Sequence, residues 1–250
     1  MKSYQDTNRE TIDRWVEEGW EWGKPISHEE YLNAKKGIWK VLLTPTKAVP
    51  HEWLANLNGK KILGLASGGG QQMPIFNALG ANCSVLDNSL KQIESEIKVA
   101  EREGYKIEAV VGDMTKTFPY EDETFDLVFH PISNCYIEDV FHVFKETYRV
   151  LKKGGLFLAG LNNEINYIVD NDENRIVWKM PFNPLLDEKA KDFLLKENCG
   201  MQFSHNMTEQ IGGQLKAGFT LLDLYEDTNG FGRLHDLNIK TYIATKAIKM

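Results

Sequence analysis

Short apolar runs alternate with longer amphipathic stretches between Lys61 and Leu161, and this alternation constrains the fold more than any other feature of the sequence. Such runs predict strands, and the stretches between them predict helices. A chain of this kind is typical of β-α-β units, so we expect an α/β protein with a Rossmann-like, mostly parallel sheet and helices on both faces. The expected strands are 61–66, 82–86, 106–111, 124–129 and 156–161, and the expected helices are 71–79, 89–103 and 137–151.

The last part of the chain follows a different pattern. A helical stretch at 208–216 precedes two strand-like runs at 219–225 and 239–247, and the turn-rich segment DTNGFGR lies between these runs. Two strands joined in this way predict a C-terminal antiparallel hairpin, which brings the expected sheet to seven strands.

The 250 residues are expected to form a single domain, 1–250. Residues 1–59 are rich in Trp, Glu and Lys and contain no strand-like run, so short helices are expected there. Residues 60–161 form the expected core, and residues 207–250 carry the last helix and the hairpin. Residues 162–206 are polar and mixed, with Pro181 and Pro184, and we interpret them as an insertion.

Charge and composition exclude several classes of protein. The chain has 29 Lys and Arg residues against 36 Asp and Glu residues, a net charge of −7 with no basic cluster, so no nucleic-acid partner is expected. No apolar stretch is long enough to span a membrane, and the start of the chain is polar and acidic, unlike a signal peptide. The three cysteines are far apart and the histidines lack ligand spacing. We therefore expect a cytoplasmic protein without a metal site or a membrane partner.

The segment KKILGLASGGGQQMPIFNALGANCSVLDNS indicates a nucleoside site. An expected strand leads into glycines 68–70, then a helix follows, and a second strand ends at Asp87, 17 positions after Gly70. Glycines at a strand-to-helix turn let a ligand approach the backbone, and the helix N-terminus offers N–H groups. An acidic residue at the end of the next strand can accept hydrogen bonds from ribose hydroxyls. The alternative is a glycine turn that only permits tight packing.

A further acidic residue, Asp113, follows the expected strand IEAVV. Its carboxylate would lie near the same sheet edge and could accept a hydrogen bond from an adenine amine. A helix cap or turn role is an equal alternative for this residue.

These motifs resemble the class I S-adenosylmethionine-dependent methyltransferases, in particular the UbiE-like small-molecule family. The resemblance covers 61–160 and lies in ILGLASGGG, SVLDNS, VVGDM, TFDLVFHP and YRVLKKGGLFLAG. The motifs LASGGGQQ, HPxSN and EQIGGQLxAGF resemble one branch of that family. The resemblance implies S-adenosylmethionine as cofactor, an N-terminal helical lid, and a small-molecule methyl acceptor. It implies cofactor-binding roles for Ala66, Ser67, Gly68, Gly70, Gln71, Asp87, Asn88, Asp113, Met114 and His130.

Two positions depart from the family pattern. The first strand has Gly64 where the family usually has an acidic residue, and Ala66 replaces the first glycine of the loop. The acidic residue normally orients the methionine amino group of the cofactor. Ser67, Gln71 or a residue of the N-terminal segment could replace it here.

Methyl transfer needs an aligned acceptor and a site without water, and an acceptor that carries a proton also needs a base. Because ligands of open parallel sheets bind beyond the carboxyl ends of the strands, we expect His130 and Asn134 at the reactive end. His130 is the first candidate base and His205 the second, although both could be structural. The candidate acceptor-binding residues are Trp20, Trp22, Tyr31 and Asn134, and Trp178, Met180 and Phe182 of the insertion are a further possible wall.

Two other functions remain open from the sequence alone. One is a protein that binds S-adenosylmethionine or S-adenosylhomocysteine without catalysis, and the other is an NAD(P)-dependent oxidoreductase. The oxidoreductase needs room for a pyrophosphate and usually a second mononucleotide-binding half. The sequence leaves the oligomeric state, the methyl acceptor and the methylated atom undetermined.

Overall fold

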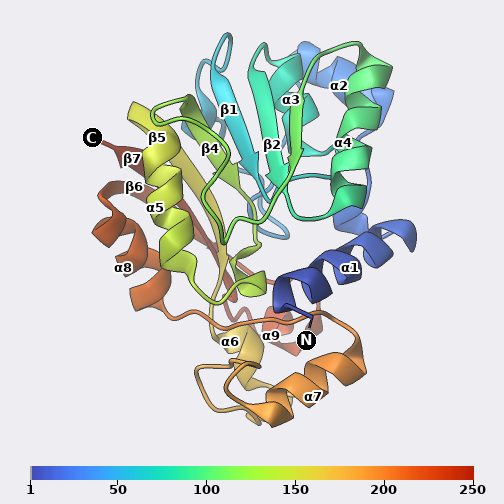
Figure 1. The fold of residues 1–250 in the computed structure, drawn as a ribbon, viewed down its shortest axis with the longest axis vertical. Helices are drawn as coiled ribbons and strands as arrows, with labels where there is room; N and C mark the ends of the chain where they lie inside the picture. Colours follow the sequence, from blue (N-terminus) through green and yellow to red (C-terminus); the bar gives the residue numbers. More distant parts are fainter. Residues whose placement is uncertain (1) are drawn as a thin grey trace.

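The computed structural model describes residues 2–250 and contains a seven-stranded sheet with the strand order β3-β2-β1-β4-β5-β7-β6 (Figure 1). Strands β1 to β5 are parallel, and β7 is antiparallel to both of its neighbours, β5 and β6. The predicted parallel sheet with its C-terminal antiparallel hairpin is therefore confirmed. The strands are β1 Lys61–Leu65, β2 Asn82–Asp87, β3 Glu108–Val111, β4 Phe125–His130, β5 Leu151–Asn162, β6 Phe219–Asp227 and β7 Tyr242–Lys249.

Helices cover both faces of this sheet and one of its ends (Figure 1). They are α1 Tyr4–Glu17, α2 His28–Lys35, α3 Gln72–Ala78, α4 Leu90–Glu103, α5 Val140–Val150, α6 Ile165–Ile168, α7 Glu188–Glu197, α8 Met207–Ala217 and α9 Gly232–Asp236. Three short 3-10 helices are η1 Glu21–Gly23, η2 His51–Leu54 and η3 Asn134–Tyr136. None of the helices within residues 2–250 is both long enough and apolar enough to cross a membrane.

The helix ends follow from local side-chain chemistry. The Ser89 hydroxyl accepts a hydrogen bond from the Gln92 amide at the start of α4, and Gly104, with a φ of 73°, ends that helix. The predicted helix 137–151 begins only at Val140, because the Asp139 carboxylate accepts the amides of Phe141 and His142 and so caps the helix there.

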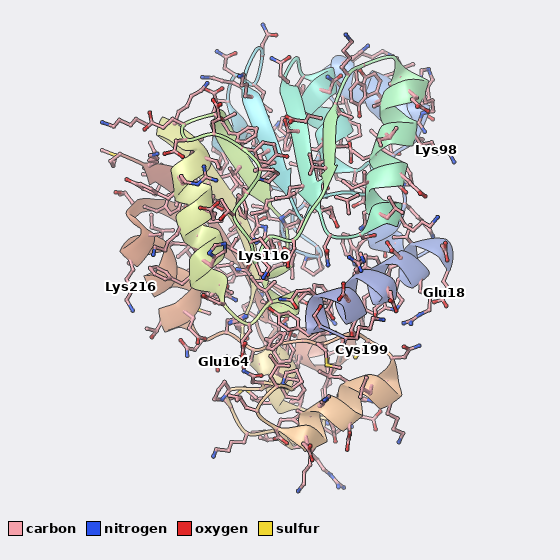
Figure 2. All side chains as sticks on the ribbon, viewed as in Figure 1. Glu18, Lys98, Lys116, Glu164, Cys199 and Lys216 are labelled. Carbon is pink, nitrogen blue, oxygen red and sulfur yellow. The ribbon has the colours of Figure 1, made fainter. Side chains whose placement is uncertain are left out.

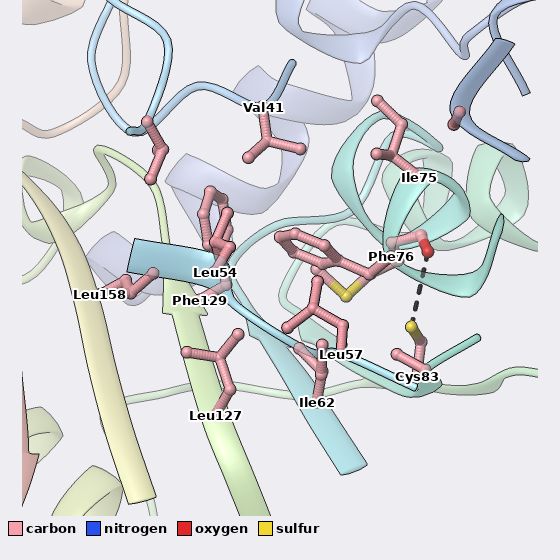
Figure 3. Close-up of a cluster of buried hydrophobic side chains, with 14 of the residues drawn as sticks. Val41, Leu54, Leu57, Ile62, Ile75, Phe76, Cys83, Leu127, Phe129 and Leu158 are labelled. Carbon is pink, nitrogen blue, oxygen red and sulfur yellow. Dashed lines mark hydrogen bonds between the residues drawn. The ribbon is translucent and has the colours of Figure 1, made fainter. Parts of the chain in front are cut away.

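Alternating residues of each strand contact opposite faces of the sheet. Ile62 packs in one cluster with α2 and α3, whereas Leu63 packs in a second cluster with α5. In β4, Leu127 likewise packs in the first cluster and Val128 in the second. Figure 3 shows part of the first cluster, in which the Cys83 thiol lies 3.4 Å from the Met73 carbonyl oxygen. This period of two explains why the strands could be predicted from apolar runs.

The N-terminal segment divides into two parts. Residues 26–57 include α2 and η2 and are largely packed in the first cluster, and the Trp53 indole donates a hydrogen bond of 3.0 Å to Asp223 on β6. In contrast, α1 lies across the end of the sheet (Figure 1), where the Asn8 amide donates to the carbonyl oxygens of Tyr136 and Met201, both at 2.9 Å. α1 and the turn after it therefore lie over the end of the sheet at which the parallel strands finish.

Residues 162–206, predicted as an insertion, contain α6 and α7 and form a third apolar cluster. This cluster includes Tyr167, Phe182 and Phe203, and Trp178 and Met180 pack against it. Arg14 of α1 donates a hydrogen bond of 2.6 Å to the Asn198 carbonyl oxygen, close to the position labelled Cys199 in Figure 2. The segment is thereby attached to α1 over the end of the sheet.

Gly160 of β5 gives a test of how the N-terminal segment packs on the sheet. A Cβ at Gly160 would lie 1.9 Å from the Leu43 carbonyl oxygen, whereas a Cβ at Gly212 of α8 would meet only Thr208, at 3.8 Å. We expect Gly160→Ala to lower the free energy of unfolding by about 3 kcal/mol or more, because backbone must move. Gly212→Ala should raise it by up to about 1 kcal/mol through helix propensity. Urea unfolding of both variants measures the difference, and equal stabilities would contradict this packing.

Candidate functional site

The glycine loop, residues 66–70, leaves the carboxyl end of β1 and is bonded to its neighbours at every glycine. The Gly68 amide donates to the Asp87 carboxylate (3.0 Å), the Gly69 amide to the Gln92 carbonyl oxygen (2.9 Å), and the Gly70 amide to the Glu96 carboxyl group (2.8 Å). These three amides are therefore bonded within the protein. The loop is held against β2 and α4 before any ligand binds.

The backbone of this loop explains its glycines. Gly69 and Gly70 have φ values of 93° and 71°, and a Cβ at Gly70 would lie 2.7 Å from Val99 of α4. Ala66 has a φ of 47°, which is unusual for a residue with a side chain. The missing side chain at Gly70 thus allows the loop to pack against α4. Gly70 lines neither of the two cavities described below.

A small cavity of about 110 Å³ lies beside this loop, at the ends of β1, β2 and β3. We call it the recess. Its wall contains four residues of α1, the turn residue Trp20, the end of β2 and the segment after β3. From the predicted cofactor-binding set, it includes Ala66, Asp87, Asn88, Asp113 and Met114.

Asp87 is the buried acidic group of the recess. Its two carboxylate oxygens accept the amides of Gly68 and Ser89, and each oxygen retains a lone pair for a further donor. Burial raises the pKa of Asp87 to about 6, although the bonds from Ser89 and Gly68 oppose this shift. The carboxylate is therefore ionised at pH 7 and can accept hydrogen bonds from two ribose hydroxyls.

A second cavity, of about 620 Å³, adjoins the recess, and we call it the large cavity. The two share Trp20, Ala66, Gln92, Ile132 and Tyr136. The predicted residues Trp22, Ser67, Gly68 and Gln71 also line the large cavity. Its remaining wall comes from distant segments: residues 42–46, the end of β5 with α6, and the β6–β7 connection.

Amides and phenols dominate the side of the large cavity under residues 162–206. The Asn162 amide donates to the Tyr167 hydroxyl (2.7 Å), and the Tyr242 hydroxyl donates to Asn229 (3.2 Å). Burial raises the pKa of Tyr167 and of Tyr242, so both phenols are neutral and act as hydrogen-bonding groups near pH 7.

His130, predicted as the first candidate base, lies outside both cavities and is fully buried. Its Nδ1 atom is 2.9 Å from the Leu65 carbonyl oxygen and its Nε2 atom 2.8 Å from Asn134 Oδ1. Burial lowers the pKa of His130. Both ring nitrogens face protein oxygens, and the neutral ring, which has one N–H, donates to one of them at a time.

Asn134 and His205 are also placed in the interior. The Asn134 amide donates to Gln210 of α8 (3.1 Å), and the residue lines neither cavity. His205 Nε2 lies 3.1 Å from the Asn134 carbonyl oxygen and 2.9 Å from that of Ile137. Asn134 and His205 thus connect η3 to the segment that leads into α8, and neither lines the recess or the large cavity.

Tyr31, a candidate acceptor-binding residue, and Gln71, a candidate cofactor-binding residue, both make hydrogen bonds within the protein. Tyr31 is buried in the first cluster, where its hydroxyl donates to Asn77 (3.0 Å), and it does not line the large cavity. The Gln71 side-chain amide donates to the carbonyl oxygens of Glu21 and Lys24, so it fastens the N-terminal turn to the glycine loop. An N-terminal aromatic residue could not be assigned to core or pocket from its position in the sequence.

Gly64 leaves space that another side chain uses. A Cβ at Gly64 would lie 2.9 Å from the sulfur of Met73 in α3. An acidic side chain at this position would have to displace Met73 from the core. At the position where the family usually has an acidic side chain, the space beside Gly64 is thus filled by Met73.

Sequence reasoning expected an N-terminal helical lid but named none of the α1 residues at the site, and it missed the β6–β7 connection. Gln5, Asn8, Arg9 and Ile12 line the recess, and Asn229 to Phe231 line the large cavity. A topological signal existed for the connection. β7 is antiparallel to β5, and β6 is antiparallel to β7, so β6 runs in the same direction as the parallel strands. The loop that follows β6 therefore leaves the sheet at the edge where the site lies.

His205 allows a test of the structural role. We expect His205→Ala to lower the free energy of unfolding by about 1–3 kcal/mol, because two buried carbonyl oxygens lose their donor. The affinity for S-adenosylhomocysteine, the ligand class that the sequence resemblance implies, should not change. Loss of turnover in a variant of unchanged stability would instead restore the catalytic interpretation.

Asp87 allows a test of the ribose contact. We expect the Kd for S-adenosylhomocysteine to rise as the pH falls through about 6, because a protonated Asp87 loses its charge as an acceptor. Asp87→Asn should raise the Kd at pH 7 about tenfold or more and remove this pH dependence. Titration calorimetry measures both effects. The matched control is Asp122→Asn, an exposed partner of Arg149, and an equal effect in that variant would contradict the assignment.

Comparison with known proteins agrees with this geometry. A family model described as "Methyltransferase domain" matches residues 63–159. The chain is 39% identical over 251 residues to the uncharacterized methyltransferase YbaJ of Bacillus subtilis (strain 168), and the match covers 97% of both chains.

Two solved structures show how widely the fold is shared. An S-adenosylmethionine-dependent methyltransferase from Mesorhizobium loti has a TM-score of 0.63 at 19% identity, with 80% of this chain and 95% of that chain covered. The [4+2]-cyclase SpnF has a TM-score of 0.62 at 14% identity, with 99% and 97% covered. At these identities the likeness concerns the fold alone.

The wall of the recess suits the ribose of an adenosyl group, since the buried Asp87 carboxylate lies there beside Ala66, at the start of the glycine loop. The match to YbaJ, a protein named as a methyltransferase, extends over nearly the whole chain. The chain therefore belongs to the class I S-adenosylmethionine-dependent methyltransferases.

Proposed function

We propose that this enzyme transfers the methyl group of S-adenosylmethionine to a small organic acceptor that binds in the large cavity. The observation that carries the proposal is the common wall of the recess and the large cavity, formed by Trp20, Ala66, Gln92, Ile132 and Tyr136. A volume of about 620 Å³ lies within the range of small-molecule sites. A cofactor in the recess would therefore face an acceptor directly.

The bound cofactor supplies a methyl group on a sulfonium, which is a good leaving group. The chain then has to align the acceptor and keep water away. Residues 162–206 and α1 lie over this end of the sheet and are joined by the Arg14–Asn198 contact. We assign the alignment of the acceptor to the neutral phenols and amides of the wall, such as Tyr167, Asn162 and Tyr242.

The charges of the wall favour one class of acceptor. Within the described residues 2–250, no Lys or Arg lines the large cavity, whereas Glu21 and Glu173 do. The protein would thus offer an anionic acceptor no cationic side chain to offset its removal from water, which is costly. We infer that the acceptor is uncharged or cationic at the end that enters the cavity.

Glu173 is the candidate to take up a proton from such an acceptor. It belongs to the segment over the sheet, and one carboxylate oxygen accepts the Leu234 amide at 2.6 Å. The other oxygen can receive a proton from a hydroxyl or an ammonium group. In contrast to Glu173, neither His130 nor His205 lines the large cavity.

The charge preference can be tested with matched acceptors. We expect tyramine and tyrosol to bind the complex with S-adenosylhomocysteine at least about tenfold more tightly than 4-hydroxyphenylacetate, which has the same ring and a negative charge. Calorimetry in the presence of saturating S-adenosylhomocysteine measures the three affinities. Release of S-adenosylhomocysteine from S-adenosylmethionine, screened over a wider set of neutral, cationic and anionic compounds, then identifies acceptors.

Productive acceptors that are all anionic would contradict the charge preference. Cofactor binding without turnover of any compound would instead favour a protein that binds the nucleoside without catalysis. Glu173→Gln should lower turnover of a proton-bearing acceptor and leave cofactor affinity unchanged, with Glu188→Gln on α7 as the matched control.

A further inference from the structure

The glycine loop contacts a buried acidic residue that the predicted site did not include. Glu96 lies on the inner face of α4, together with Gln92 and Val99, at helical spacings of four and three residues. All three contact the loop: Gln92 accepts the Gly69 amide, Glu96 accepts the Gly70 amide, and Val99 limits the space at Gly70. One helix face thus supports the loop.

The surroundings of Glu96 provide little to stabilise a charge. The residue is fully buried, its Oε2 atom has only the Gly70 amide as partner at 2.8 Å, and its Oε1 atom is buried with no partner in the described protein. The titratable groups that act on it are Asp87 and Cys83 of β2 and Tyr105 after α4, none of which is a cation. Lys98, labelled in Figure 2, extends from the exposed side of the same helix.

Two features therefore favour the protonated form of Glu96. Desolvation is the larger, and the nearby Asp87 carboxylate adds to it, so that the pKa of Glu96 is raised to about 8 in spite of the Gly70 bond. At pH 7 Glu96 is an uncharged acid, while Asp87 is ionised. The two acidic groups of the loop are thus in different protonation states.

We propose that Glu96 is a positioning residue of the cofactor site: its uncharged carboxyl group holds the Gly70 amide, and loss of its proton loosens the glycine loop and weakens cofactor binding. A second negative charge beside Asp87 would have neither water nor a cation around it. Movement of the loop to admit water would relieve that cost, and the recess shares this loop. This inference concerns the cofactor side and does not depend on the acceptor proposed above.

The test uses 5′-methylthioadenosine, which contains the adenosine and thioether of the cofactor and no group that titrates between about pH 6 and about pH 10. We expect its Kd for the wild-type protein to be constant from about pH 7 to about pH 8 and then to rise by up to tenfold for each further pH unit. Glu96→Gln retains an oxygen for the Gly70 amide and cannot ionise. Its Kd should match the wild-type value at pH 7 and stay constant at higher pH.

The control is Glu94→Gln, because Glu94 is exposed on the same helix and pairs with Lys91. This variant should show the wild-type pH profile. A wild-type Kd that is constant to about pH 9.5, or a profile that Glu96→Gln leaves unchanged, would overturn the proposal.

Stability of the ligand-free protein gives a second readout. Because the pKa of Glu96 is raised in the folded state, its stabilising effect is fully present below the unfolded pKa of about 4.5 and is lost as the pH rises to about 8. The free energy of unfolding of the wild type minus that of Glu96→Gln should therefore fall as the pH rises from about 4.5 to about 8. Above about pH 8 this difference should be constant. A difference that is independent of pH would also overturn the proposal. If Glu96→Gln does not fold, the wild-type affinity profile alone decides.

Discussion

The attachment of the glycine loop to β2 and α4 is the interaction on which the rest of the site depends. Three successive amides bond to Asp87, to the Gln92 carbonyl oxygen and to Glu96, and two of these three acceptors are buried acids. The same carboxylate that fixes Gly68 faces the recess, so the position of the loop and the shape of the recess are coupled through Asp87. The walls of both cavities include Ala66 at the start of this loop. A shift of the loop would therefore change cofactor binding and access to the acceptor together.

The acceptor side is assembled differently, from segments that are distant in the sequence and meet only because of the strand order. Residues 42–46, the end of β5 and the β6–β7 connection converge where β5 and β7 pair. Their side chains are mostly neutral, and the two carboxylates of the wall belong to Glu21 of η1 and to Glu173. The cofactor side thus uses buried charge and fixed backbone, whereas the acceptor side uses neutral hydrogen-bonding groups.

The sequence could predict the parts of this structure that depend on local periodicity. Strands β1, β2 and β4 alternate between two clusters with a period of two, and this made them recognisable, as did Asp87 at the end of β2. Side-chain direction over long distances could not be predicted. His130 is at the carboxyl end of β4, as expected, yet its ring points to Leu65 and Asn134 inside the protein. Tyr31 looked the same as Trp20 in the sequence, and only the packing of α2 against Asn77 and Tyr105 assigns it to the core.

The placement of the histidines bears on the chemistry. The described wall of the large cavity contains no imidazole: its polar groups are carboxylates, phenols with raised pKa values and amides. Such a wall suits a reaction in which alignment and exclusion of water contribute most of the rate, as displacement at a sulfonium does. The fold itself does not impose that reaction, since a [4+2]-cyclase has the same fold over nearly the whole chain. We therefore expect the segments that line the large cavity, among them residues 42–46, residues 162–206 and the β6–β7 connection, to determine which acceptor this enzyme takes.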